Sequence, residues 1–247
     1  MLELEALFRW IHVVAGVVWI GHLYFFNFVN SVFAPTMDGE TKKKVVPQLM
    51  PRALYWFRWG AAWTWVSGVL LLLLVFYHGD VALEGNRDWN ALAILMIAAI
   101  FLLPGAYDVL AGQVKDNRVL AGIALVAVAI LIVIYQAAGF SYRGYSIHVG
   151  ALFGTAMAMN VWMRIWPAQR RIITATRDGQ APNPADPALA GTRSKHNTYM
   201  SVPLIWMMLN QHTVTFAGGF VTLVVIIAIG WAATNLLYKK AAKVAGF

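Results

Sequence analysis

The chain has 247 residues, of which 60% are hydrophobic and 12% charged, and its formal net charge is +8. A soluble domain is typically about 45–50% apolar and about 25% charged, so this composition excludes an ordinary soluble globular enzyme. A chain this apolar must satisfy its backbone hydrogen bonds within lipid, which only helices and closed barrels can do. The sequence therefore predicts an all-α integral membrane protein, a single transmembrane helical domain over residues 1–247.

Seven apolar segments, separated by polar or charged stretches, predict the spanning helices. In chain order they are Ala6–Phe33, Phe57–Tyr77, Trp89–Gly112, Val119–Ala138, Tyr145–Trp166, Thr198–Gln211 and Val214–Tyr238. A tilted helix needs roughly 20 residues to cross the hydrocarbon, and most segments reach that length. The sixth is short and contains Pro203, which predicts a less regular span buried inside the bundle.

The charges between these segments predict an orientation. Lysines and arginines gather in alternate connections, namely the loop with Lys42–Lys44 and Arg52, the loops at 115–118 and 164–195, and the tail after Tyr238. The positive-inside rule then places the C-terminus in the cytoplasm and the N-terminus outside. We expect a multi-pass protein of a bacterial-type inner (cytoplasmic) membrane, whose positive charge marks its cytoplasmic face and not a nucleic-acid partner.

The longest connection is predicted to be a cytoplasmic linker of about 167–197. Its middle, 178–187, contains three prolines and no apolar periodicity. Such a composition is typical of an extended connection and not of a ligand-binding loop.

Ionisable residues within the spans are the functional candidates, because burying them in lipid is costly. The chain has six histidines and no cysteine, which excludes Cys-ligated zinc, iron–sulfur clusters and covalently attached haem. Four histidines are predicted to lie in the outer half of the bilayer or at its edge: His12, His78, His148 and His212. Imidazoles from several helices at one depth predict a haem, another metal or a proton relay.

Haem b fits this pattern best, and we expect two of His12, His148 and His212 to ligate its iron. Arg9 and Arg143, near the outer surface, are expected to neutralise the haem propionates. The residues that leave clearance for a macrocycle or offer it flat walls are Gly16, Gly150, Gly154, Trp10, Trp19, Phe153 and Trp162.

Two alternatives remain beside this interpretation. The Gly150-x-x-x-Gly154 pattern is also a helix-packing motif, and histidines or arginines at an interface often only snorkel. A second haem on the inner side, held by His22 and His196, is also possible. Asn160, Thr64 and Ser67 are predicted to form hydrogen bonds between helices.

Several stretches resemble the membrane-bound urate hydroxylase family, also described as the urate oxidase N-terminal domain. They cover nearly the whole chain: Arg9–Gly21, Thr64–Gly68, Tyr107–Leu110, His148–Val161, Pro167–Arg170, Arg193–Tyr199, Pro203 and Asn210–His212. Among the histidines, His12, His148, His196 and His212 match family positions, whereas His78 and His22 match no motif position.

The resemblance implies an integral membrane domain that, in the urate-oxidising members, is joined to a C-terminal cytochrome c. Electrons from urate are thought to pass to that cytochrome. Because this sequence has no cysteine, it lacks the cytochrome module, and we expect a separate cytochrome c to accept the electrons.

Three functions follow from these observations. The first is an oxidoreductase similar to urate hydroxylase, with no residue yet assigned a catalytic role. The second is a non-catalytic electron-transfer or structural subunit of a larger respiratory or photosynthetic membrane complex. The third, a transporter with a histidine proton relay, is disfavoured because the sequence shows no inverted repeat.

Overall fold

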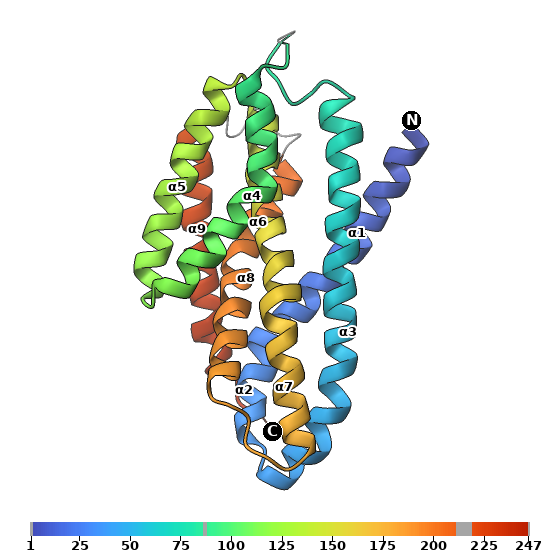
Figure 1. Ribbon diagram of the computed structural model, residues 1–247, viewed down its shortest axis with the longest axis vertical. Coiled ribbons are helices and arrows are strands. Elements are labelled where there is room, and N and C mark those ends of the chain that lie inside the picture. Colours follow the sequence, from blue (N-terminus) through green and yellow to red (C-terminus); the bar gives the residue numbers. More distant parts are fainter. Residues whose placement is uncertain (1, 86–87, 211–218, 247) are drawn as a thin grey trace. The chain divides into compact units, whose positions relative to one another are not determined.

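The computed structural model describes residues 2–85, 88–210 and 219–246, and most of these residues are helical (Figure 1). The described part of the chain contains no strand, only one isolated bridge between Leu83 and Phe140. The predicted all-α membrane fold is therefore confirmed. The predicted span ends at Gln211 and Val214 and the histidine at position 212 lie outside the described residues.

The helices follow one another with short connections. Their bounds are α1 Leu2–Tyr24, η1 Phe25–Asn30, α2 Ser31–Phe33, η2 Ala34–Thr36, α3 Gly39–Leu71, η3 Leu72–Tyr77, α4 Ala91–Gln113, α5 Asn117–Ala137, α6 Tyr142–Met159, η4 Asn160–Ile165, α7 Trp166–Arg177, α8 Ala185–Leu209 and α9 Phe220–Ala241. The segments η1, η3 and η4 are π-helical, and η2 is a turn of 3-10 helix.

Five helical segments among the described residues are long and apolar enough to cross a membrane. They are Leu2–Thr36, Gly39–Tyr77, Ala91–Gln113, Asn117–Ala137 and Phe220–Ala241. The fifth predicted span corresponds to α6 with η4 and the sixth to α8, and these helices carry several buried polar side chains, among them His148, Asn160 and Asn197. These polar residues make the two helices less apolar than the other five. The count of seven spans and the orientation stay predictions.

Two predicted connections are wrong, because both are largely helical. Lys42–Lys44 and Arg52, expected in a loop, lie in α3, and the continuous helix to Tyr77 has 39 residues. At roughly 1.5 Å per residue this is about twice the hydrocarbon thickness of roughly 30 Å, so part of it extends beyond the lipid core. The expected linker of 167–197 is likewise occupied by α7 and the first half of α8, with only residues 178–184 between them.

The chain packs as two compact units, which we describe separately. The first comprises the described residues of segments 1–8, 68–156 and 200–232. Its core contains Phe76, Ile132, Tyr135, Phe153 and Met207. Within this unit α4 and α5 form a hairpin, and α4, which contains Pro104, changes direction partway along its length (Figure 1). A proline removes a backbone donor and bends a helix in this way.

The second unit comprises the described residues of segments 9–67, 157–199 and 233–247. Here α1 and α3 approach closely at Gly60, where an added Cβ would lie 3.0 Å from the backbone nitrogen of Trp19. A side chain at position 60 would push the helices apart, so the glycine sets their spacing. Phe26 and Phe57 continue the contact with an edge-to-face ring pair whose centroids are 5.4 Å apart.

Candidate functional site

The first candidate centre is His148, a fully buried histidine in α6 of the first unit. It lies almost two turns into the helix and not in the first turn as expected, because α6 begins at Tyr142. Its Nδ1 is 2.6 Å from the carbonyl oxygen of Gly144, one turn earlier, and its Nε2 is 3.0 Å from the hydroxyl oxygen of Tyr77. Both ring nitrogens are therefore hydrogen-bonded.

These two partners determine the tautomer of His148. A carbonyl oxygen can only accept, so Nδ1 carries the proton and donates it to Gly144. Nε2 then holds a lone pair, and the Tyr77 hydroxyl donates to it. A histidine that ligates a metal through one nitrogen commonly donates the other N–H to a backbone carbonyl, which fixes its orientation. His148 has this arrangement on its Nδ1 side, while its Nε2 lone pair accepts from the Tyr77 hydroxyl.

Aromatic rings enclose the imidazole of His148. The rings of Phe140, Tyr135, Tyr77 and Phe76 lie with centroids 4.7, 5.5, 5.6 and 6.5 Å from it. The hydroxyl of Tyr135 donates to the carbonyl oxygen of Met96 at 2.9 Å, which ties α5 to α4. None of these aromatic partners was predicted from the sequence, although Tyr77 directly precedes the predicted candidate His78.

The other outer-face candidates of the first unit have different surroundings. His78 caps the end of η3 and is exposed, so it is Tyr77 and not His78 that contacts His148. Arg143, in the first turn of α6, is partly buried, and its Nε has no hydrogen-bond partner among the described residues.

Gly150 and Gly154 face α8 of the same unit. An added Cβ would lie 3.1 Å from the Cβ of Met207 at position 150, and 3.5 Å from a methyl group of Leu204 at position 154. These glycines therefore allow close packing of α6 on α8, which favours the helix-packing interpretation over clearance for a macrocycle.

The second candidate centre is His12 in α1 of the second unit. Its Nδ1 lies 3.2 Å from the hydroxyl oxygen of Ser67 in α3, and Ser67 donates its own proton to the carbonyl oxygen of Trp63. The hydroxyl must accept from His12, so His12 also carries its proton on Nδ1 and its lone pair on Nε2. The predicted interhelical bond of Ser67 is thus confirmed, whereas Thr64 donates to Gly60 within its own helix.

Of the two histidines considered for an inner haem, His22 resembles His148 in the hydrogen bond of its Nδ1. His22 donates from Nδ1 to the carbonyl oxygen of Val18 at 2.7 Å. His196 is partly buried in α8, beside Asn197. Arg9 is partly buried in α1. Across the described residues, no group of three or more histidines and carboxylates could hold a metal ion.

A buried polar network in the second unit was only partly predicted. The side-chain amide of Asn160 donates to the amide oxygen of Asn197 at 2.8 Å, which confirms the predicted interhelical bond, and Asn197 donates to the carbonyl oxygen of Met157 at 3.0 Å. Asn27 donates to the hydroxyl of Ser194 and accepts from the hydroxyl of Tyr238, both at 2.8 Å. The stretch Arg193–Tyr199 therefore contributes to a network with η1, η4 and α9.

Each π-helical segment supplies one polar side chain to these sites. Asn27 lies in η1, Tyr77 ends η3, and Asn160 begins η4. A π-helical turn is rare in proteins and occurs frequently at functional sites. The three irregular turns therefore mark the two units' polar centres independently of the histidines.

Comparison with known proteins gives a family match. The family model described as urate oxidase N-terminal matches residues 39–244, a range that includes His148 and Ser67 but not His12. No curated protein and no solved structure matches the chain.

Proposed function

Because the chain belongs to the urate oxidase N-terminal family, we propose that it is a redox protein of a bacterial-type inner membrane that binds haem b and passes electrons to a separate cytochrome c. The family and the helices of spanning length support a multi-pass membrane protein of a redox type. The haem, the electron acceptor and the substrate, for which urate is the candidate, are parts of the proposal.

The observation that carries this proposal is the setting of His148. Its Nδ1 proton is bonded to the carbonyl oxygen of Gly144, so Nε2 carries the lone pair with which His148 would hold a haem iron once the Tyr77 hydroxyl moves away. The donor chemistry of His12, with Nδ1 bonded to Ser67, is of the same kind. Haem, when bound, would supply reversible one-electron transfer.

The remaining residues have supporting roles in this proposal. His148 is the first choice of iron ligand in the first unit, with His212 as its proposed partner and His78 as the weakest candidate because of its exposure. Arg143 has a buried guanidinium nitrogen without a partner among the described residues, which suits a propionate. In the second unit His12 is the proposed iron ligand and Arg9 the proposed propionate partner.

A reduced-minus-oxidised spectrum of the purified chain tests the haem proposal. We expect b-type bands, a large loss of haem in His148→Ala and a small loss in His196→Ala. Because His148→Ala leaves a cavity, His148→Gly with added imidazole provides the control, and imidazole should restore the bands. Absence of b-type bands in every preparation, or equal haem content in the two alanine variants, would contradict the proposal.

A second experiment separates the enzyme from the non-catalytic subunit. Urate is added to the haem-loaded protein in the absence of oxygen and in the presence of oxidised cytochrome c. The absorption spectra of the protein's haem b and of the cytochrome c haem are followed. Reduction of both supports a urate-oxidising enzyme. Bound haem that urate does not reduce would instead favour an electron-transfer or structural subunit of a larger complex.

A further inference from the structure

Arg58 is a partly buried arginine within the membrane-spanning helix α3 of the second unit. Its guanidinium carbon lies 3.6 Å from the centre of the Trp166 ring and 5.4 Å from that of Trp162. Its Nε donates to the carbonyl oxygen of Leu54 at 3.2 Å. The guanidinium is thus held by stacking and by one hydrogen bond, and no hydrogen bond from its two terminal nitrogens is found among the described residues, which leaves them for another acceptor.

No carboxylate within the described ranges pairs with Arg58. The carboxylates of Asp186 and Asp178 are bonded to Arg171 and Arg177, and that of Asp38 to Thr41. A cation in a spanning helix is costly unless an anion or water compensates it. Cation–π contacts contribute about 0.5–2 kcal/mol each, too little to replace a counter-ion, so the position calls for an anion.

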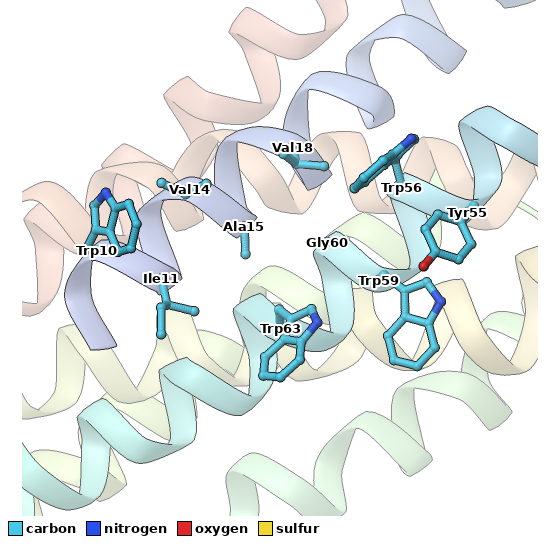
Figure 2. A pocket seen from close by; sticks show the side chains of 10 residues that line it. All are labelled: Trp10, Ile11, Val14, Ala15, Val18, Tyr55, Trp56, Trp59, Gly60 and Trp63. Carbon is cyan, nitrogen blue, oxygen red and sulfur yellow. The ribbon is translucent and has the colours of Figure 1, made fainter. Parts of the chain in front are cut away.

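An apolar groove between α1 and α3 begins beside this arginine. It has a volume of about 460 Å³ and is lined by the ten side chains of Figure 2, most of them aromatic or aliphatic. Ala15 and Gly60 contribute little or no side chain to its lining, and Trp59 and Trp63 project from successive turns of α3 on the same side (Figure 2). The groove is open to the surroundings of the helices, where lipid chains lie.

Trp59 connects the groove to the arginine. It lines the groove, and its ring meets that of Trp162 edge to face at 5.7 Å, while Trp162 in turn lies beside the guanidinium of Arg58. Along α3 the groove runs from Tyr55, less than one turn before Arg58, to Trp63, which is the direction that leads deeper into the predicted span. A ligand of this site would therefore place a negatively charged group beside Arg58, near one end of the groove. An apolar chain of the same ligand would lie along the remainder of the groove.

We propose that this site binds one anionic phospholipid, with its phosphate on the terminal nitrogens of Arg58 and one acyl chain in the groove. A guanidinium matches phosphate oxygens with two parallel hydrogen bonds, and the predicted orientation places Arg58 at the cytoplasmic leaflet, which carries the anionic lipids. The inference goes beyond the redox function and does not depend on haem.

Lipid retention measured by native mass spectrometry of the full chain in detergent tests the proposal. Phosphatidylglycerol and phosphatidylcholine with the same acyl chains are offered together. We expect the wild type to prefer phosphatidylglycerol, and Arg58→Gln to lower that preference about tenfold. Arg58→Lys should retain part of it, because it keeps the charge but loses the paired hydrogen bonds. Arg52→Gln is the matched control, since Arg52 is exposed on the same helix and bonded to Gln48.

A separate substitution tests whether the groove binds the acyl chain. Ala15→Leu fills the groove and should lower retention of both lipids several-fold, whereas Val17→Leu, on an exposed position outside the groove, should not. An unchanged lipid preference in both Arg58 variants would overturn the proposal. So would thermal stabilisation by inorganic phosphate alone equal to that by phosphatidylglycerol, because the site would then take soluble anions. If Arg58→Gln does not fold, Arg58→Lys decides the first test.

Discussion

The hydroxyl oxygen of Tyr77 lies 3.0 Å from Nε2 of His148, in the buried core of the first unit. Because Nδ1 donates to Gly144, the tyrosine must donate to the nitrogen that an iron would bind. Tyr77 therefore competes with any metal for the same lone pair, and loading of His148 with haem requires the tyrosine side chain to move.

Replacing Tyr77 by phenylalanine tests this competition. The variant keeps the ring packing but leaves the buried Nε2 without a donor, which should lower the free energy of unfolding by about 1–3 kcal/mol. The same change removes the competitor, so the affinity of the apoprotein for haem should rise by up to about tenfold. Thermal unfolding and a haem titration measure the two effects, and weaker haem binding would contradict the competition.

Tyr142→Phe is the control for loss of a tyrosine hydroxyl in the same unit. The Tyr142 hydroxyl is buried and has no hydrogen-bond partner among the described residues. Its removal takes away a desolvated polar group and no hydrogen bond, so we expect an equal or higher melting temperature. The haem affinity should stay unchanged.

The bond between Asn160 and Asn197 allows a double-mutant cycle in the second unit. Each single change to alanine leaves a buried amide partly unsatisfied and should cost about 1–3 kcal/mol. The double variant should cost less than the sum, with a coupling of about 0.5–1.5 kcal/mol, the range found for hydrogen bonds between membrane helices. Unfolding of the four proteins in mixed micelles measures the cycle, and strictly additive losses would show that the bond contributes nothing.

The sequence predicted the spanning helices well and the segments that connect them less well. Apolar segments of spanning length are local patterns, and each predicted span corresponds to an observed helix. The helical residues 42–52 and 167–177 were missed because a helix beyond the lipid no longer needs to be apolar. Pro167 does not prevent the second of these helices, because it lies in the first turn of α7, where the missing N–H costs little.

In the candidate site, too, the individual residues were predictable from the sequence but their contacts were not. His12 and His148 stand out in the sequence because a buried imidazole needs a reason, and both are hydrogen-bonded inside their units. Their partners Ser67 and Tyr77 lie 55 and 71 residues away in the chain. Such pairings depend on tertiary packing, and no local pattern around an ordinary tyrosine distinguishes Tyr77 from the others.

Gly144 has a specific structural role next to His148. An added Cβ at position 144 would overlap the carbonyl group of Ala82, whose oxygen also accepts from the backbone of Ser141. Gly144→Ala should therefore displace the start of α6 and destabilise the protein by about 1–3 kcal/mol, as overpacking does. Because Gly144 also accepts the Nδ1 proton of His148, haem content should fall with stability.

Gly122→Ala provides the matched control in α5, where an added Cβ would meet nothing within 4 Å. Alanine is favoured over glycine inside a helix by about 0.5–1 kcal/mol, so this variant should be slightly more stable than the wild type. Melting temperatures of the two variants, measured in one detergent, should move in opposite directions. A shift in the same direction would show that the local environment of position 144 is not the cause.

The ion pair between Arg171 and Asp186 joins α7 to the start of α8, and it predicts a dependence of stability on pH. Nε of Arg171 donates to the carboxylate at 3.0 Å, and these hydrogen bonds hold the pKa of Asp186 below its ordinary value. A carboxylate with a lowered folded-state pKa stabilises the fold above its unfolded pKa of about 4, and this contribution is lost as the pH falls through the folded pKa. Arg171→Gln should therefore lower the melting temperature at neutral pH but not in strong acid, where Asp186 is protonated in both proteins. Arg177→Gln is the control, because it removes a more exposed pair with the adjacent Asp178, and it should change the melting temperature less. An equal or larger effect of Arg177→Gln would contradict the assignment. So would an effect of Arg171→Gln that does not depend on pH.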